Sequence, residues 1–297
     1  MNIKRVSALI IGGGPAGAQC ALWLKMLGHH PVIVEQAEVL GGLQALSPYQ
    51  NHWMVGLRHQ SGKALAAGIT AHIHEMGIPV LFKTQVDDVV VKADGVYVNA
   101  GSHRYHADYL VIASGVVPRR DVFRESDKVL VGPGEAVYHG NFAGKRVAIL
   151  GGGDNAYENQ AFIMGKNPAC CHVYARTKRA RRNLAVEVDP AHVFSGEYRA
   201  DQASMTVTYA GEARSYDMFI VLYGWEANLP SALNAWRESL LDERGFVATN
   251  AFCQTREPRF FAIGEVADRM HPCVVTAMAD GVVAAKAMLV GLEGSIK

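Results

Sequence analysis

Two glycine-rich segments with the spacing of dinucleotide-binding loops stand far apart in this sequence. They are Gly12-Gly13-Gly14-Pro15-Ala16-Gly17 and Gly151-Gly152-Gly153-Asp154-Asn155-Ala156, and each follows an apolar, β-branched run and opens a helix-like stretch. Glycines here let a strand turn sharply into a helix and let a pyrophosphate approach the backbone, while the helix N-terminus supplies amide donors and a partial positive charge. One chain is therefore predicted to bind two dinucleotides.

An acidic residue ends the strand that follows the first loop. The apolar run Pro31-Val32-Ile33-Val34 leads directly to Glu35. A carboxylate in this position accepts hydrogen bonds from ribose hydroxyls and repels a 2′-phosphate. The first loop is therefore predicted to bind an unphosphorylated adenosine ribose.

A basic run occupies the equivalent place after the second loop. The strand His172-Val173-Tyr174-Ala175 leads to Arg176, which is followed by Lys178, Arg179, Arg181 and Arg182. Guanidinium groups bind phosphate in a fixed geometry. Such a run is also typical of a solvated surface turn, but this one begins at the strand end where ribose chemistry is recognised. We therefore predict NADPH at the second loop, with its 2′-phosphate bound by Arg176, helped by Lys178 or Arg181.

Composition indicates a compact soluble enzyme of two modest domains. The chain has 297 residues, of which 49% are hydrophobic and 19% charged. A net charge of +1 gives no electrostatic case for nucleic acid or an anionic membrane, and no apolar run is expected to span a bilayer. The five cysteines are an odd number without a disulfide framework, which predicts a reducing cytoplasm.

A strand, a turn and a helix near the C-terminus predict a flavin. The strand 259–263 delivers Gly264 and Glu265, and a helix is expected over 276–289. Glu265 is then placed to bind a ribityl hydroxyl, and the helix N-terminus points at the N1 and O2 edge of the flavin, which becomes anionic on reduction.

The predicted fold class is α/β, with two Rossmann-like dinucleotide-binding domains. The first domain is discontinuous, over 1–115 and 242–297, and the second, 116–241, is inserted into it. In the first domain, helices are expected over 15–28 and 61–76, an antiparallel pair over 86–91 and 96–99, and a buried strand over 107–115, with 116–118 as a linker.

Taken together, these motifs resemble the low-molecular-weight thioredoxin reductases and their relatives, flavoproteins with the pyridine nucleotide-disulfide oxidoreductase fold. The resemblance covers nearly the whole chain and is carried by the first loop with Glu35, by Gly41-Gly42, by Ala113-Ser114-Gly115, by the second loop with Arg176 and by the run 262–268. It implies FAD in the discontinuous domain, NADPH in the inserted one, a homodimer, and hydride transfer from nicotinamide C4 to flavin N5. The family usually has Asp where this chain has Glu265.

The motifs and the resemblance assign residues to the two cofactors. Those predicted for FAD are Gly12, Gly14, Pro15, Ala16, Gly17, Glu35, Gln36, Gly42, Gln44, Tyr49, Asn51, His52, Val86, Ala113, Ser114, Gly115, Gly264, Glu265, Val274 and Val275. Those predicted for NADPH are Gly151, Gly153, Asp154, Asn155, Ala156, Arg176, Lys178 and Arg181. No catalytic side chain and no metal ligand is assigned, because the cofactors carry the hydride chemistry.

An aromatic side chain covers the flavin ring in some of these relatives. Tyr49 is the first candidate here, with His52 and Trp53 behind it. The alternative is that these rings only pack their loop.

The chain departs from thioredoxin reductases at the redox disulfide. Those enzymes carry a CxxC shortly before the glycine loop of the inserted domain, whereas the matching segment 134–142 contains no cysteine. The only close pair, Cys170-Cys171, is more typical of core packing. Thioredoxin reduction by the usual dithiol route is therefore excluded.

Ferredoxin:NADP reductases of the thioredoxin reductase-like type also lack the CxxC. The resemblance is nearest in kind to them, so we predict an FAD-dependent NADPH oxidoreductase that passes electrons to a carrier such as ferredoxin or flavodoxin, or to a small acceptor. The alternatives are a flavin-dependent dithiol oxidase or an oxygen-reducing NAD(P)H oxidase. An alternative from another class is a non-catalytic, nucleotide-responsive binding protein, although the two intact loops argue against it.

Overall fold

The chain divides into two compact units, one of them discontinuous in sequence. The computed structural model describes residues 3–181, 188–269 and 271–294. The first unit combines Met1–Val117 with Glu226–Lys297, and the second is Pro118–Trp225. Each unit is built around a sheet whose central strands are parallel, with a glycine loop where one of these strands ends, as the two loop motifs require.

The first unit contains a seven-stranded sheet in the order β3-β2-β1-β6-β5-β4, with β17 paired to β6. Strands β1, β2, β3, β6 and β17 are parallel, whereas β5 and β4 add an antiparallel hairpin. Their bounds are β1 Lys4–Ile11, β2 Pro31–Val34, β3 Val80–Leu81, β4 Val86–Lys92, β5 Gly95–Ala100, β6 His103–Ile112 and β17 Phe260–Ala262. The ends of β1, β6 and β17 therefore meet at one edge of the sheet.

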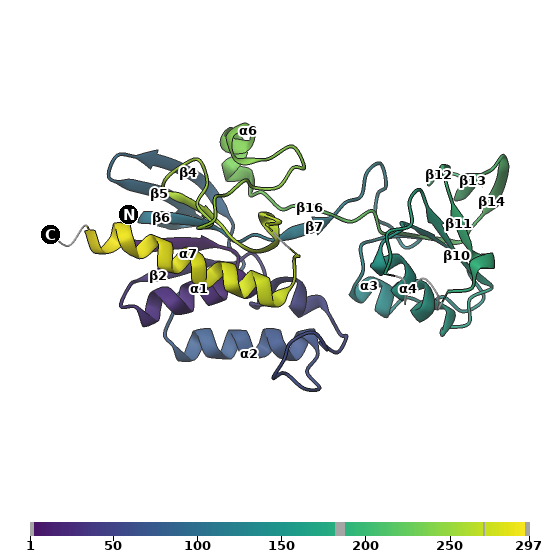
Figure 1. Ribbon diagram of the computed structural model, residues 1–297, viewed down its shortest axis with the longest axis horizontal. Coiled ribbons are helices and arrows are strands. Elements are labelled where there is room, and N and C mark those ends of the chain that lie inside the picture. The colour runs from purple at the N-terminus through teal and green to yellow at the C-terminus, as the bar shows by residue number, and fades with distance from the viewer. Residues whose placement is uncertain (1–2, 182–187, 270, 295–297) are drawn as a thin grey trace. The chain divides into compact units, whose positions relative to one another are not determined.

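Helices α1 and α7 lie side by side against one face of this sheet (Figure 1). Successive side chains of β1 alternate between faces, so Ile10 joins the core beneath these helices while Leu9 packs in the opposite core. The helical elements are α1 Pro15–Met26, η1 Gly42–Leu46, α2 Gly62–Glu75, η3 Ser231–Trp236, α6 Arg237–Leu240, η4 Gly264–Val266 and α7 Val274–Gly294.

The segment 226–241 belongs to the first unit, which differs from the predicted boundary at residue 242. Leu233 and Leu240 are buried there in the same core as Val96 of β5. These residues form a 3₁₀ turn and one short helix, so the sequence offers no extended apolar period to link them to the first unit.

Helix α7 corrects the expectation that no apolar run could span a bilayer. Over Val274–Leu292 it is long and apolar enough by length and composition to do so. Core helices also pass that test, and here Ala277, Ala284 and Met288 are buried in the core that contains α1. The helix also begins earlier and ends later than the expected range 276–289.

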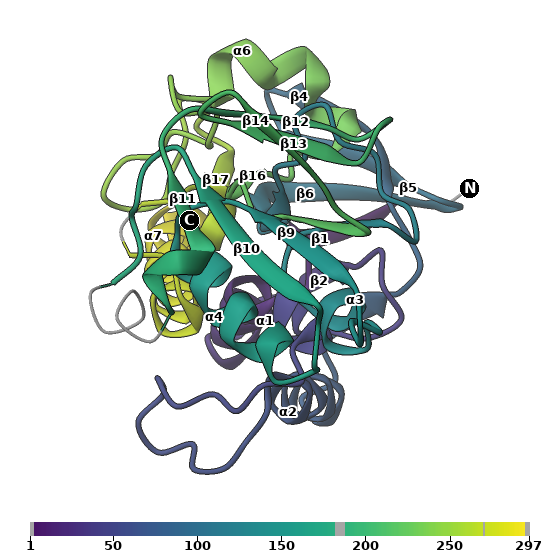
Figure 2. The same cartoon turned by 90° about the vertical axis from the view of Figure 1, so that its right-hand side faces the viewer.

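The second unit contains a five-stranded parallel sheet in the order β11-β10-β9-β15-β8. An antiparallel meander, β12-β13-β14, lies on one side of it and α4 on the other (Figure 2). The elements are β8 Val129–Val131, α3 Glu135–Tyr138, β9 Arg146–Leu150, α4 Asp154–Met164, β10 Cys170–Ala175, η2 Pro190–His192, β11 Val193–Ser195, β12 Tyr198–Asp201, β13 Thr206–Tyr209, β14 Glu212–Ser215 and β15 Met218–Val221.

The chain leaves and re-enters the first unit through two strands that pair with each other. These are β7 (Val116–Pro118) and β16 (Trp225–Ala227). The predicted linker is thus a strand.

The close packing of α1 against α7 generates a stability prediction. In Gly281→Ala the new Cβ would lie 2.5 Å from the carbonyl oxygen of Ala16 and 2.8 Å from the amide nitrogen of Cys20. Because backbone cannot yield locally, we expect a loss of about 1–3 kcal/mol in the free energy of unfolding of the FAD-free protein. Guanidinium titrations followed by circular dichroism measure this.

Gly68→Ala is the matched control, because Gly68 lies in α2 with open space around it. It should gain about 0.4–1 kcal/mol, since alanine restricts the unfolded chain more than glycine does. Equal stability of the Gly281→Ala variant and the unmodified protein would contradict the α1–α7 contact.

Candidate cofactor sites

The first glycine loop is bare backbone where β1 ends and α1 begins. Gly12 has φ +103°, and a Cβ there would lie 2.4 Å from the carbonyl oxygen of Ala113, so only glycine fits. Gly14 precedes the first turn of α1 and Pro15 occupies that turn, where its missing amide hydrogen costs nothing. The arrangement leaves helix amide groups and the positive end of the helix dipole available to a pyrophosphate.

Glu35 is buried and fixed beside this loop. Its Oε2 accepts a 2.7 Å hydrogen bond from the amide of Gly13, and its Oε1 accepts one of 2.8 Å from the amide of Ala37. An ionised carboxylate has about four acceptor positions, so two remain for ribose hydroxyls. The structure thus places Glu35 beside the loop, as the motif requires.

The Gly41-Gly42 pair and the 113–115 segment line the same loop. The amide of Gly41 donates to the carbonyl of Gly13 at 2.8 Å, and a Cβ on Gly42 would lie 3.2 Å from Cα of Gly14. Ser114 Oγ is buried and has no hydrogen-bond partner within the part of the chain that the structure describes. A bare backbone cradle with an unpaired buried hydroxyl fits a dinucleotide such as FAD.

The Gly264–Glu265 turn is held by α7. Oδ2 of Asp280 accepts a 3.1 Å hydrogen bond from the amide of Gly264. Nε of Arg269 lies 3.6 Å from Oδ1 of Asp280, and Arg269 also donates to Sγ of Cys253. Sequence analysis missed Asp280 and Arg269, although an aspartate within the apolar run of α7 was a usable signal.

The Glu265 carboxyl lies in an unfavourable setting for its charge. Burial first, and then the negative charge of Asp268, raise the pKa of Glu265 above its ordinary value. Asp268 is itself paired with Arg244, whose Nη1 is 2.9 Å from its Oδ2. A carboxylate destabilised in this way would gain from hydrogen-bond donors on a bound ligand.

The remaining residues predicted for FAD are spread over the first unit. Tyr49, Asn51 and His52 lie in a largely exposed loop that a bridge between Gln50 and Ser61 returns to α2. The predicted covering role of Tyr49 stays a prediction. Val86 is buried at the start of β4. Val274 is the first residue of α7, and the next residue, Val275, is exposed. Gln36 is exposed just after β2, and Gln44 lies in η1.

The second glycine loop repeats the geometry of the first. Gly151 has φ +153°, and a Cβ there would lie 2.3 Å from the carbonyl oxygen of Leu222 at the end of β15. Gly153 precedes α4, and Asp154, Asn155 and the buried Ala156 form its first turn. The helix N-terminus therefore stands at the edge of the sheet, as it does in the first unit.

The basic segment after β10 is only partly available to a ligand. Arg176 and Lys178 are exposed. Arg181 instead forms ion pairs with Asp154 (2.8 Å) and Glu158 (3.3 Å) on α4. In this ligand-free structure the Arg181 side chain is thus paired with two carboxylates, and its predicted role at the phosphate stays a prediction. Arg182 lies outside the described residues.

Helix α3 stands in the segment where a CxxC was expected from the resemblance. The segment 134–142 contains no cysteine, and Val137 and Phe142 fill the core of the second unit. All five cysteines are free thiols, and Cys20, Cys171 and Cys253 are buried. In this fold the segment therefore packs against the core of the second unit and contains no redox-active cysteine.

Comparisons with known proteins agree with this architecture. Residues 6–281 match the family described as pyridine nucleotide-disulphide oxidoreductase. The chain is similar to a ferredoxin–NADP reductase of Limosilactobacillus fermentum (27% identity, covering 88% of this chain and 86% of the relative). It is also similar to a thioredoxin reductase of Bacillus subtilis (24% identity, covering 96% and 94%).

Among solved structures, a thioredoxin reductase from Lactococcus lactis has the same fold, with a TM-score of 0.79 at 19% identity over 96% of this chain and 98% of the other. The chain belongs to the pyridine nucleotide-disulphide oxidoreductase family. Within it, this protein is a flavoprotein oxidoreductase of the thioredoxin reductase-like type, whose members typically bind FAD and NAD(P)H.

The raised pKa of Glu265 predicts a pH-dependent stability effect. A carboxyl whose folded pKa is raised stabilises the fold below its unfolded pKa, and that contribution is lost as pH rises through the folded pKa. Glu265→Gln should therefore raise the free energy of unfolding of the FAD-free protein at pH 7, and this gain should shrink as the pH falls towards 4.5.

The same variant should bind FAD about tenfold more weakly, because a neutral acceptor replaces a charged one. Denaturation titrations between pH 4 and 8 and fluorescence titration with FAD measure the two effects. Glu243→Gln, an exposed carboxyl in the same unit, is the control. A Glu265→Gln variant with unchanged stability at every pH would contradict the raised pKa of Glu265 in the folded protein.

Proposed function

We propose that this protein transfers hydride from NADPH to FAD and passes the electrons directly to a carrier such as ferredoxin or flavodoxin, or to a small acceptor. The observation that carries the proposal is the combination of two intact dinucleotide loops with a cysteine-free segment at 134–142. Similarity to a ferredoxin–NADP reductase supports it.

The residues have binding and orienting roles in this proposal. Glu35 and the start of α1 would hold the adenosine half of FAD, and Glu265 its ribityl chain. Bound FAD supplies the chemistry that accepts a hydride and releases single electrons. The N-terminus of α7 would favour negative charge on the reduced flavin.

Two alternative functions follow from the same fold. The first is a flavin-dependent dithiol oxidase or an oxygen-reducing NAD(P)H oxidase, which would use the same bound flavin. A non-catalytic, nucleotide-responsive protein would keep the fold without turnover. Assays that vary both the electron donor and the acceptor separate these alternatives. Both oxidases reduce oxygen but differ in their donor, and the non-catalytic protein turns over with none.

The first test asks whether electrons pass from NADPH through the flavin to a carrier when single cysteines are replaced. Purified protein should be yellow, release FAD on denaturation, and show bleaching of its flavin absorbance by NADPH under anaerobic stopped flow. Cys170→Ser, Cys171→Ser and Cys273→Ser variants that retain FAD should reduce ferredoxin or flavodoxin at the unmodified rate, since the flavin itself hands on the electrons.

Two outcomes would overturn this assignment. A flavin-loaded cysteine variant that keeps flavin reduction but loses turnover with the carrier would reinstate a thiol relay. Consumption of oxygen with NADPH or with a small dithiol as the electron donor, and no turnover with either carrier, would favour the oxidase alternative.

We further propose that the protein is a homodimer, as the family resemblance implies. The first unit has a groove of about 280 Å³ whose lining includes Leu22 of α1, Ile69 of α2 and Met278 of α7. The nearby helices also expose Met26 and Val290, at 67% and 81% of their surface. Exposed apolar surface of this kind is typical of interaction sites.

Sedimentation velocity tests the dimer. The unmodified protein should sediment as a dimer, and Ile69→Glu should shift it to a monomer because a charge would be buried in the interface. Val90→Glu, on the exposed side of β4, is the control and should remain dimeric. A monomeric unmodified protein at micromolar concentration would contradict the proposal.

A further inference from the structure

Arg269 joins three separate segments of the first unit. Its Nε lies 3.6 Å from Oδ1 of Asp280 in α7. Its guanidinium also donates to the carbonyl of Ala251 at 3.1 Å and to Sγ of the fully buried Cys253. Arg269 itself follows the turn that begins at Gly264. Because these contacts come from several directions, they fix the guanidinium and hold its charge in one place.

The carboxylate of Asp280 is bound from two sides. Its Oδ2 accepts a 3.1 Å hydrogen bond from the amide of Gly264, while its Oδ1 faces Arg269. Gly264 has φ +73°, and a Cβ there would lie 2.9 Å from Cβ of Ala16 in α1. The turn is therefore held between α7 and α1. Since Glu265 is the next residue along the chain, Asp280 helps to fix where the Glu265 carboxyl lies.

Arg269 and Asp280 are both largely shielded from water. Their side chains are 25% and 17% exposed. Burial raises the pKa of Asp280, whereas the positive charge of Arg269 and the hydrogen bond from Gly264 act in the opposite direction. A shielded charge acts more strongly on its neighbours than an exposed one, because water and salt screen it less. The two opposite charges therefore cancel locally, and the pair adds little net charge to the turn.

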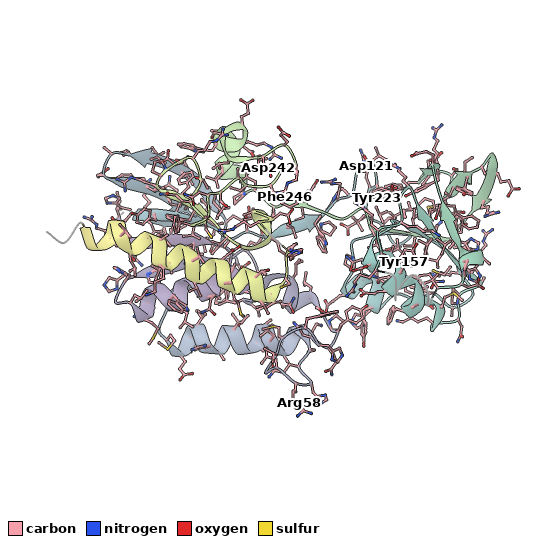
Figure 3. All side chains as sticks on the ribbon, viewed as in Figure 1. Arg58, Asp121, Tyr157, Tyr223, Asp242 and Phe246 are labelled. Carbon is pink, nitrogen blue, oxygen red and sulfur yellow. The ribbon has the colours of Figure 1, made fainter. Side chains whose placement is uncertain are left out.

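A separate group of charges lies on the more exposed side of the same turn. Nη1 of Arg244 lies 2.9 Å from Oδ2 of Asp268, and its Nη2 lies 3.0 Å from Oδ2 of Asp242. The guanidinium carbon of Arg244 lies 5.7 Å from the ring centre of Phe246, which is labelled together with Asp242 in Figure 3. The Arg244 side chain is 59% exposed, so solvent screens its charge more than that of Arg269.

We propose that Arg269 and Asp280 are positioning residues for FAD, and that the neutrality of their ion pair sets how strongly the bound flavin favours its reduced form. This inference rests on the proposed binding of FAD at the Gly264 turn. Reduction adds negative charge to the N1 and O2 edge of the flavin, which the N-terminus of α7 is expected to face. Asp280 lies in the second turn of the same helix, so an unpaired carboxylate there would oppose the positive helix end.

The two-electron midpoint potential of the FAD-loaded protein tests the charge balance. Arg269→Met removes the positive charge and should lower the potential by about 30 mV, which is a tenfold weaker preference for reduced flavin. Asp280→Asn removes the negative charge and should raise the potential by a similar amount. The double variant is neutral again and should return close to the potential of the unmodified protein. Arg269→Lys keeps the charge and should also leave the potential unchanged.

FAD affinity separates positioning from charge. The side-chain oxygen of Asp280→Asn can still accept from the amide of Gly264, so this variant should bind oxidised FAD within about threefold of the unmodified protein. Asp280→Ala leaves that amide unpaired and should weaken FAD binding roughly tenfold. Fluorescence titration of the FAD-free protein measures both.

Arg5→Met is the matched control for the loss of an ion-paired arginine. Arg5 lies 3.5 Å from Asp108 at the start of β1, whereas the glycine loop follows the other end of that strand. The variant should change neither the potential nor the affinity for FAD.

The possible outcomes distinguish this proposal from the proposed function. Potentials that shift in the same direction in Arg269→Met and Asp280→Asn, or that do not shift, would overturn the charge balance. Unchanged FAD affinity in Asp280→Ala would remove its positioning role. The potential is measured without an electron acceptor, so a protein that binds FAD but reduces no carrier would refute the proposed electron transfer and leave this proposal standing. A protein that binds no FAD would overturn both.

Discussion

The close approach of Gly12 to the backbone of Ala113 is the constraint on which the first unit depends. It lets β1 end beside β6 with no side chain between them, so α1 starts directly at the sheet edge. The turn at Gly264 uses the same edge, where a Cβ would lie 2.9 Å from Cβ of Ala16. Three segments distant in sequence therefore reach one site because small residues stand at each contact.

The two units meet the same structural need with different chemistry. In the first, the carboxylate of Glu35 holds the amide of Gly13. In the second, backbone amides hold the carbonyl of Gly152, and the Asp154–Arg181 ion pair reinforces them. An acid that closes the first loop is compatible with an unphosphorylated ribose, whereas the second loop is closed without placing an acid at the strand end. The residue at the strand end of the second unit can therefore be basic, whereas that of the first unit is acidic.

Much of this architecture follows from local sequence signals. Both glycine loops, the strand before Glu35 and the hairpin of β4 and β5 lie where their motifs predict. The fate of residues 226–241 could not be predicted, because Leu233 and Leu240 acquire their meaning only from burial against distant strands. The ion pairs of Arg181 were hidden for a similar reason: a run of basic residues does not indicate which member faces the acids of α4.

The state of the cysteines bears on how electrons leave the flavin. Burial raises the pKa of the Cys20 and Cys171 thiols far above the ordinary value and that of Cys253 to about 12, so these groups stay protonated and unreactive. Cys273 differs: burial opposes ionisation, but hydrogen bonds with Thr276 and the backbone hold its pKa below the ordinary value. A relay of the thioredoxin reductase kind needs two thiols that close a disulfide with each other, and one exposed thiol at the start of α7 does not provide that pair. The proposed direct transfer from the flavin to the acceptor needs no such pair of thiols, and is therefore more compatible with these cysteines than a dithiol relay is.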